Sequence, residues 1–230
     1  MSSALPEPVR SSSQLRPGFA GPVSGGGGSV YIVDKPPGPT SFAQVASLRR
    51  LLGIKKAGHA GTLDPDASGI LIVLTGQATR VAKFFEGLDK EYLAVIRLGT
   101  TTDTYDLSGQ VLSTSDVPVF SRAEIGKALS NFQGHIMQVP PAFSAIKKDG
   151  QPLYKAARQG IEVELVPRPV EIHRIRLEEI NLPEITISVK CSKGTYIRSL
   201  AFDLGKILGC GAALAKLVRT AVGEFTLARA

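Results

Sequence analysis

The sequence has few residues of the kinds that build metal sites, disulfide frameworks or membrane spans. Its 230 residues include two cysteines, Cys191 and Cys210, and three histidines, none of which shows metal-ligand spacing. Purely apolar stretches such as Ile70 to Leu74 are short, whereas a membrane-spanning helix needs about 20 apolar residues. We therefore expect no disulfide framework, no metal and no membrane span, in a reducing, cytoplasmic compartment.

A phosphate-cradling loop is also missing. No G-x-x-x-x-G-K-[ST] or G-x-G-x-x-G motif stands between a strand and a helix, which argues against nucleoside triphosphates as substrates. The 27 basic and 20 acidic residues give a net charge of +7. This charge favours an anionic partner such as nucleic acid, although many soluble proteins without such a partner carry a similar excess.

The chain divides into a tail and one folded domain. Residues 1–28 include 16 Gly, Pro or Ser, and such a segment cannot bury enough apolar surface to offset the entropy of ordering. We expect residues 1–28 to be a disordered tail and residues 29–230 to form one continuous domain. Hydrophobic residues at 43% and charged residues at 20% are ordinary values for a folded globular protein.

The pattern of apolar residues predicts interleaved strands and helices. Strands are expected at Tyr31–Val33, Gly69–Leu74 and Tyr92–Leu98, with an antiparallel pair at Val170–Ile180 and Glu184–Cys191. Helices are expected from a Thr40 or Ser41 cap to Leu52, at Ala78–Glu86, from the Ser121–Glu124 capping box to Asn131, at Leu153–Gln159 and at Tyr196–Leu208. Because the best strands are neighbours in sequence, we expect an α+β fold with a central mixed, mostly antiparallel sheet flanked by helices.

The densest unusual segment is GHAGTLDPDASG at Gly58–Gly69, which we interpret as a loop with special backbone angles. Asp64 in this loop is a candidate nucleophile, which needs a cationic or hydrogen-bonding partner to stay ionised in a desolvated pocket. In the alternative interpretation, Asp64 only caps an Asx turn ahead of Pro65. An aspartyl-phosphate mechanism through Asp64 and Asp66 is disfavoured, because no buried apolar strand directly precedes Asp64.

A second segment, CSKGTYIRSL at Cys191–Leu200, places Arg198 near the start of the predicted last helix. The helix dipole does not favour an arginine there, so a specific carboxylate or phosphate partner is one interpretation and a solvated arginine is the other. Tyr92 opens a predicted strand, where an aromatic residue is more often part of the core than a stacking platform. His59 by itself fits a capping or core-edge role.

Taken together, these segments resemble the TruB family of tRNA pseudouridine synthases. The resemblance extends from Val30 to Leu227. It rests on GHAGTLDPDASGILIVLTGQATR at 58–80, KEYLAVIRLGTTTDTYDLSG at 90–109, CSKGTYIRSLAFDLGKILGCGAALAKLVRT at 191–220, Asp34-Lys35-Pro36, Thr40-Ser41, 140–144 and 154–162. It implies a pseudouridine synthase fold and isomerisation of uridine to pseudouridine at position 55 in the T-loop of tRNA. It also implies a catalytic domain at 29–230, a monomer, and no cofactor or metal.

The resemblance also assigns roles to individual residues. Asp64 matches the catalytic aspartate, which acts on the ribose through attack on C1′ or through a glycal intermediate. Arg198 matches the arginine that pairs with this carboxylate, and Tyr92 the tyrosine that stacks on the target base and assists loss of the C5 proton. The other matches are His59, which fills the space left by the flipped base, Tyr196 and Leu217 as apolar pocket residues, Asp106 as a polar residue near the uracil, and Lys35 as support for the loop. Candidates for phosphate contacts are the remaining Lys and Arg, including Arg49, Arg50, Lys55, Lys56, Lys147, Lys148 and Lys155.

The sequence departs from the family pattern in two respects. Ala60 and Asp66 stand where the family often has a small hydroxyl residue and an apolar one, and we expect activity to survive both changes. Many relatives continue into a C-terminal RNA-binding domain of the PUA type, and we expect no PUA domain here and weaker contact with the acceptor arm of tRNA. The alternative function is a tRNA-binding folding helper that opens and recloses the elbow.

Overall fold

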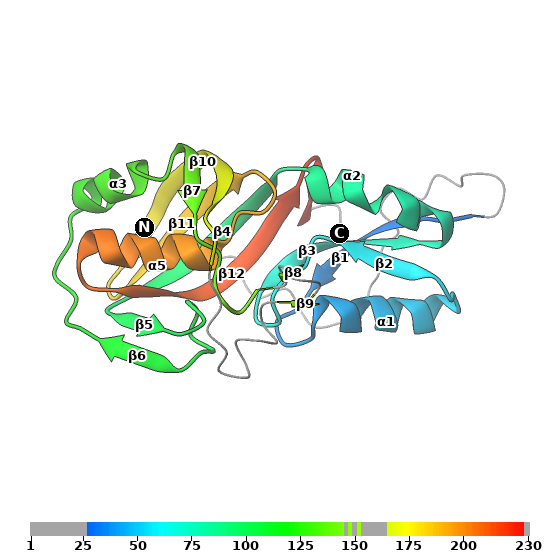
Figure 1. Ribbon diagram of the computed structural model, residues 1–230, viewed down its shortest axis with the longest axis horizontal. Helices are drawn as coiled ribbons and strands as arrows, with labels where there is room; N and C mark the ends of the chain where they lie inside the picture. The colour runs from blue at the N-terminus through cyan, green and yellow to red at the C-terminus, as the bar shows by residue number, and fades with distance from the viewer. Residues whose placement is uncertain (1–26, 145–146, 149–150, 153–164, 228–230) are drawn as a thin grey trace, which may run out of the picture.

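A computed structural model describes residues 27–144, 147–148, 151–152 and 165–227 (Figure 1). The strands of its main sheet are β1 (Val30–Lys35), β2 (Ala57–Ala60), β3 (Ser68–Thr75), β4 (Lys90–Leu98), β7 (Gly134–Gln138), β10 (Arg168–Asn181), β11 (Glu184–Cys191), β12 (Ala212–Val222) and β13 (Phe225–Thr226). Two small sheets pair β5 (Thr100–Thr102) with β6 (Val111–Thr114), and β8 (Lys147–Lys148) with β9 (Gln151–Pro152). The described helices are α1 (Ser41–Leu52), α2 (Ala82–Gly87), α3 (Arg122–Ser130), α5 (Ile197–Leu208) and the 3-10 helix η1 (Gly76–Val81).

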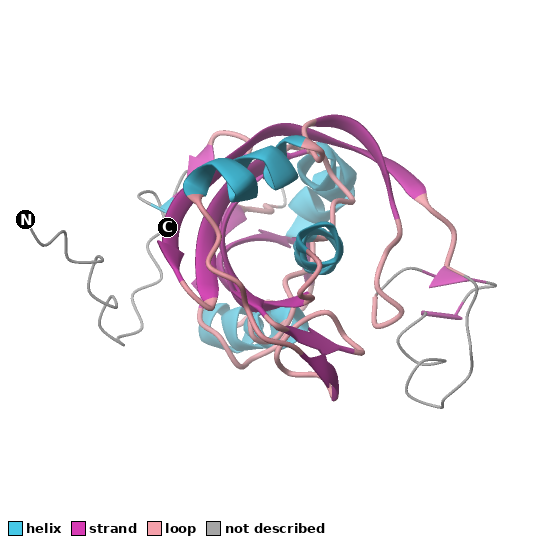
Figure 2. Ribbon diagram, turned by 90° about the vertical axis from the view of Figure 1, so that its left-hand side faces the viewer, coloured by secondary structure: helices cyan, strands magenta, loops and turns pink. Residues whose placement is uncertain are grey.

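The main sheet has the strand order β1-β3-β12-β4-β11-β10-β7, with β2 attached to β3 and β13 to β12. All neighbours in it are antiparallel except β3 and β12, which run parallel and pair at Ser68–Val218 and Gly69–Arg219. Strands β4 and β12 pair along most of their length, with Tyr92 opposite Arg219. The expected α+β fold with a mixed, mostly antiparallel sheet is therefore confirmed, and Figure 2 shows how strongly the sheet curls.

The core lies in clusters on the two halves of the sheet. The largest cluster joins β4, β11 and β12 to α5 and α3, with Ile96, Ile187 and Leu200 fully buried. On the other half, β1 and β3 contribute to one cluster that includes Phe85 of α2 and to another that includes Val45 of α1. Burial of this apolar surface is the main term that stabilises the fold. None of the helices in the described part of the chain is long and apolar enough to cross a membrane.

Most of the expected elements are confirmed. Helix α1 begins at its Thr40 cap, which accepts a hydrogen bond from the Ala43 amide, and ends at Gly53 with a left-handed φ of 63°. The Ser121–Glu124 capping box, the β10–β11 pair and the last helix are present as well. The helix expected at 153–159 lies outside the described residues.

Two expectations were wrong. The stretch Ala78–Glu86 is not one helix but the end of η1 followed by α2. The segment Gly58–Gly69 is not loop throughout, because its first three residues belong to β2, which pairs with β3 and places His59 opposite Val73. The central strand β12 was not expected at all.

Candidate active site

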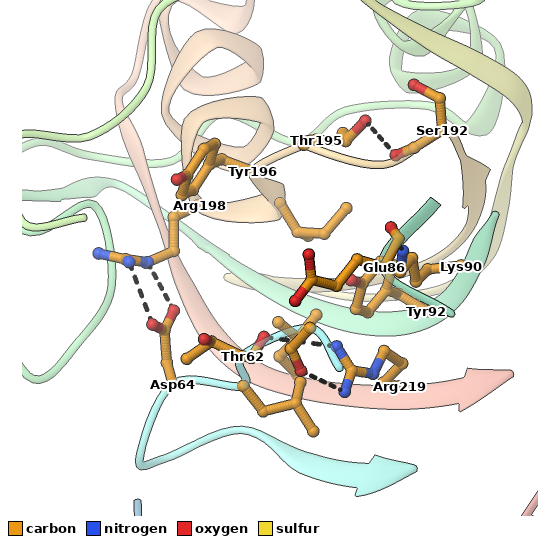
Figure 3. Close-up of a pocket in the computed structure, with 15 residues that line it drawn as sticks. Thr62, Asp64, Glu86, Lys90, Tyr92, Ser192, Thr195, Tyr196, Arg198 and Arg219 are labelled. Carbon is orange, nitrogen blue, oxygen red and sulfur yellow. Dashed lines mark hydrogen bonds and ion pairs between the residues drawn. The ribbon is translucent and has the colours of Figure 1, made fainter. Parts of the chain in front are cut away.

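A cleft of about 270 Å³ opens where the two halves of the sheet meet. Its walls come from segments far apart in the sequence: the turn between β2 and β3, strand β4, the start of α5, and strand β12 (Figure 3). The expected site residues on this wall are Asp64, Tyr92, Tyr196, Arg198 and Leu217. The fold therefore brings the two singled-out segments, Gly58–Gly69 and Cys191–Leu200, together in one cavity.

Asp64 and Arg198 face each other at one end of this cleft. The Nε atom of Arg198 lies 2.9 Å from Oδ2 of Asp64, and its Nη2 donates a hydrogen bond to Oδ1 at 3.3 Å, as the dashed lines in Figure 3 show. The side chain of Arg198 is 6% exposed, whereas that of Asp64 is 44% exposed and reaches into the cleft. This two-point contact fixes the orientation of the carboxylate as a single ammonium could not.

Arg198 is itself fixed by two backbone carbonyls. It donates hydrogen bonds to the oxygens of Thr104 at 3.1 Å and of Phe143 at 3.0 Å. Asp106 adds a second carboxylate, with its Oδ2 3.6 Å from Nε of Arg198. Because these contacts occupy both sides of the guanidinium, the arginine has little freedom to turn away from Asp64.

The electrostatics of Asp64 combine burial with charge. Burial raises the pKa of the Asp64 carboxyl above its ordinary value of 3.8, and the negative charge of Asp106 acts in the same direction. The positive charge of Arg198, its hydrogen bond and the charge of Lys35 act in the opposite direction and favour the carboxylate. The site therefore holds a partly desolvated carboxylate beside a fixed cation.

Lys35 holds the Asp64 loop, which is the segment of residues 61–67 between β2 and β3. This fully buried lysine donates from Nζ to the carbonyl oxygens of Pro65 at 2.8 Å, Ala67 at 2.6 Å and Pro36 at 3.0 Å. Burial is the main cause that lowers the pKa of Lys35. Ser41, at the start of α1, both donates to and accepts from the backbone of Leu63 at 2.9 Å. The backbone on either side of Asp64 is thus anchored to β1 and α1.

Tyr92 lies on β4 and lines the cleft together with Tyr196 and Leu217. Burial raises the pKa of the Tyr92 phenol, and the neighbouring Arg219 guanidinium offsets part of that rise. Burial likewise raises the pKa of Tyr196. These side chains supply a largely apolar wall with a few polar tips, which suits a flat heteroaromatic ring.

Three of the expected site residues do not line the cleft. Asp106 contacts Arg198, and Lys35 binds the Asp64 loop, so both residues touch cleft residues without lining the cleft themselves. His59 lies on β2, half-buried, and its Nδ1 has no hydrogen-bond partner among the described residues. Burial is the main cause that lowers its pKa. Of the candidate phosphate contacts, Arg49, Arg50, Lys55 and Lys56 are exposed, while the side chains of Lys147, Lys148 and Lys155 lie outside the described residues.

Sequence reasoning missed several cleft residues. Lys90 and Arg219 are both buried on the wall, beside Glu86 and Thr62. Arg219 lies within one of the resembling segments, but the resemblance did not place it in the cleft. A signal was available, because an arginine within the mainly apolar stretch 212–222 needs a buried polar partner. Among the described residues no group of three His, Cys, Asp or Glu is arranged to hold a metal ion.

Comparison with known proteins identifies the class to which this fold and site belong. Residues 49–197 match the family model described as TruB family pseudouridylate synthase (N terminal domain). The chain belongs to this family, and it is thereby an enzyme of the isomerase class. The expected family resemblance is confirmed.

Particular relatives carry the name tRNA pseudouridine synthase B. The protein of that name from Opitutus terrae is 51% identical over 201 residues, which cover 87% of this chain and 83% of the relative. Those from Protochlamydia amoebophila and Geotalea uraniireducens are 51% and 48% identical, with 75% and 63% of their own length covered. The chain thus spans between about two thirds and four fifths of these relatives.

Solved structures agree with the fold. The chain resembles one in the crystal structure of a Cbf5-Nop10-Gar1 complex, with a TM-score of 0.66 and 35% identity over 86% of this chain and 49% of that one. It also resembles a chain of an H/ACA RNP bound to a substrate RNA containing 2′-deoxyuridine, with a TM-score of 0.63 and 32% identity over 86% of this chain and 48% of that one. Each solved chain is thus about twice as long as the part matched.

Proposed function

We propose that this enzyme isomerises uridine to pseudouridine at position 55 in the T-loop of tRNA, with Asp64 as its catalytic residue. The observation that carries the proposal is the Asp64 carboxylate, held at two points by Arg198 and open to the cleft. The names of the tRNA pseudouridine synthase B relatives support tRNA as the substrate. The choice of the T-loop uridine rests on the resemblance of the site segments.

The reaction breaks the bond between N1 of the uracil and C1′ of the ribose and forms a bond between C5 and C1′. The proton on C5 is released, and a proton is returned to N1, so the change is redox-neutral. Asp64 acts on the ribose, either by attacking C1′ or by promoting a glycal intermediate. Both routes need the charged carboxylate, which Arg198 favours. This chemistry needs no redox cofactor, and we propose that the enzyme works as a monomer without a metal.

The cleft also suits the detached base. Tyr92 and Leu217 line the cleft, and we propose that the uracil stacks and turns against them while the Tyr92 phenol assists loss of the C5 proton. A uridine inside a folded T-loop cannot reach Asp64, so the nucleotide must be flipped out of its stack at a cost of a few kcal/mol. We propose that His59 occupies the space that the flipped base leaves.

Exposed basic residues supply the contacts to the RNA backbone. Arg49 and Arg50 in the last turn of α1, with Lys55 and Lys56 after it, form an exposed positive segment ahead of β2. Each phosphate neutralised releases condensed counterions, so binding should weaken steeply with added salt. These contacts position the tRNA and leave selection of the uridine to the cleft.

The decisive experiment measures tritium release from a tRNA transcript that carries [5-³H]uridine. We expect release by the wild type, confined to the T-loop uridine, and none by Asp64→Asn at unchanged tRNA affinity. Asp66→Asn is the matched control, because Asp66 is an exposed acid two residues away in the same loop. Binding of tRNA by the wild type without any tritium release would reject the proposal in favour of a tRNA folding helper.

A further inference from the structure

Arg219 is a buried arginine at the junction of three central strands. It lies on β12, is 1% exposed, and stands opposite Tyr92 of β4 on one side and Gly69 of β3 on the other. Its side chain also reaches the wall of the active-site cleft, as Figure 3 shows. The residue thus touches both the strand that carries Tyr92 and the segment that carries Asp64.

The guanidinium of Arg219 holds both ends of the Asp64 loop. Its Nη2 donates to the carbonyl oxygen of Gly61 at 3.0 Å and its Nη1 to that of Thr62 at 3.4 Å, just before Asp64. Its Nε donates to the carbonyl oxygen of Ile70 at 2.7 Å, where the chain enters β3 after the loop. A planar fork of N–H groups therefore closes the base of the loop.

Two glycines with left-handed backbone angles lie at or near the ends of the loop, and Gly69 allows the close approach to Arg219. Gly69 has a φ of +99°, and a Cβ atom there would overlap the backbone of Arg219. Gly61 has a φ of +82° and lies against Nη1 of Arg219, at 3.5 Å from an ideal Cβ position. Lys35 binds the middle of the same loop through the carbonyls of Pro65 and Ala67. Two buried cations thus hold the ends and the middle of the loop separately.

Stability alone does not account for this arginine. Its side chain donates hydrogen bonds to backbone carbonyls and also neighbours the Tyr92 phenol, so among the described residues its charge is buried against dipoles rather than against a carboxylate. Burying a charge is costly, and a well-packed apolar side chain in such a place is often equally stabilising or more so. What an apolar side chain cannot supply is a fixed distance between the Asp64 loop and the strand of Tyr92.

We propose that Arg219 is a positioning residue for the isomerisation, which sets the Asp64 carboxylate relative to Tyr92 by clamping both ends of the Asp64 loop to β12. The inference rests on the proposed function, because it concerns the same reaction. Small misplacements of reacting groups lower rates by roughly 100-fold. Loss of the clamp should therefore act on the chemical step more than on tRNA binding.

The test is single-turnover tritium release from [5-³H]uridine tRNA, with enzyme in excess, for Arg219→Lys and Arg219→Met. Lysine keeps the charge but cannot reach three carbonyls in fork geometry, and methionine removes the charge while filling most of the space. Arg97→Lys is the control, since Arg97 is a half-exposed arginine on the neighbouring strand β4, paired with Glu184. In this design a misfolded fraction lowers the amplitude, whereas a misplaced carboxylate lowers the rate constant.

For both Arg219 variants we expect the rate constant to fall by roughly 10- to 100-fold, with the tRNA dissociation constant changed less than about threefold. The Arg97 variant should match the wild type. Rate constants within about twofold of the wild type, with only the amplitude or melting temperature lowered, would show that Arg219 is a core residue. Wild-type activity with unaffected variants overturns only this role, whereas an inactive wild type overturns the proposed function together with it.

Discussion

The ring of Tyr105 stacks on the ring of Phe202, with the centroids 4.0 Å apart and an angle of 11° between the planes. Tyr105 has a left-handed φ of 65°, which a residue with a side chain adopts at a cost of roughly 1 kcal/mol. Its carbonyl accepts a hydrogen bond from the Leu214 amide at 2.9 Å. The stack therefore holds the turn that contains Thr104 and Asp106 against α5, where both residues meet Arg198.

Phe202→Ala should weaken this turn. We expect a loss of about 2 kcal/mol in the free energy of unfolding, because the variant removes a half-buried ring and its stacking contact with Tyr105. The single-turnover rate should fall as well, since Asp106 and the Thr104 carbonyl lose their support. Phe84→Ala is the control, because Phe84 is 66% exposed on α2. Urea denaturation measures the free energy of unfolding, and tritium release measures the single-turnover rate. Equal losses in Phe202→Ala and Phe84→Ala would contradict a specific role of the Tyr105–Phe202 stack.

The pH dependence of the reaction should reflect the surroundings of Asp64. The pKa of Asp64 is raised, so on acidification the carboxylate, and with it activity, is lost at a higher pH than an ordinary aspartate with a pKa of 3.8 would give. Asp106→Asn removes a negative charge that raises this pKa, and should move the acid limb of the pH profile downwards. A single-turnover pH series checks this, with the exposed Asp116→Asn as control. An acid limb that stays in place would exclude Asp64 as its origin.

Lys90 should make the stability of the enzyme depend on pH in the alkaline range. Burial and the charge of Arg219 lower the pKa of Lys90 from 10.5 to about 8. Between these values the unfolded chain keeps a proton that the folded chain has lost, so the free energy of unfolding should gain a contribution as the pH rises from about 8 to 10.5. Lys90→Met should lack that gain, and the exposed Lys83→Met should keep it. Melting temperatures of the wild type and both variants, measured across this pH range, test the prediction.

Gly69→Ala should be among the most destabilising single substitutions in the described chain. The added Cβ overlaps the Arg219 backbone, and the φ of +99° disfavours any side chain. We expect a loss of at least about 3 kcal/mol. Gly58→Ala is the matched control on the adjacent strand β2, because nothing lies within 4 Å of its ideal Cβ, and it should cost less than about 1 kcal/mol. Similar melting temperatures for both variants would be inconsistent with the close β3–β12 contact.

Local signals in the sequence were sufficient for several elements. The Thr40 cap with Gly53, and the Ser121–Glu124 capping box, each fix the end of a helix through groups a few residues apart, so their positions follow from the sequence. Strand β12 was not predicted because its sequence lacks a clear alternation of apolar and polar residues. Its partners β3 and β4 also lie more than a hundred residues earlier in the chain. Strand β2 was not predicted because glycine and alanine, which make up three of its four residues, are depleted in strands.

The features of the active site likewise fall into those that the sequence determined and those that the tertiary structure decided. The sequence by itself determined the family and the candidate residues Asp64, Tyr92 and Arg198, because their motifs are specific strings of neighbouring residues. The family resemblance also implied that Arg198 pairs with Asp64. Only the tertiary structure decided that this pairing is a two-point contact across 134 positions, that His59 lies outside the cleft, and that Arg219 holds the Asp64 loop at both ends. These contacts depend on strand order and register, which long-range packing sets and no short motif encodes.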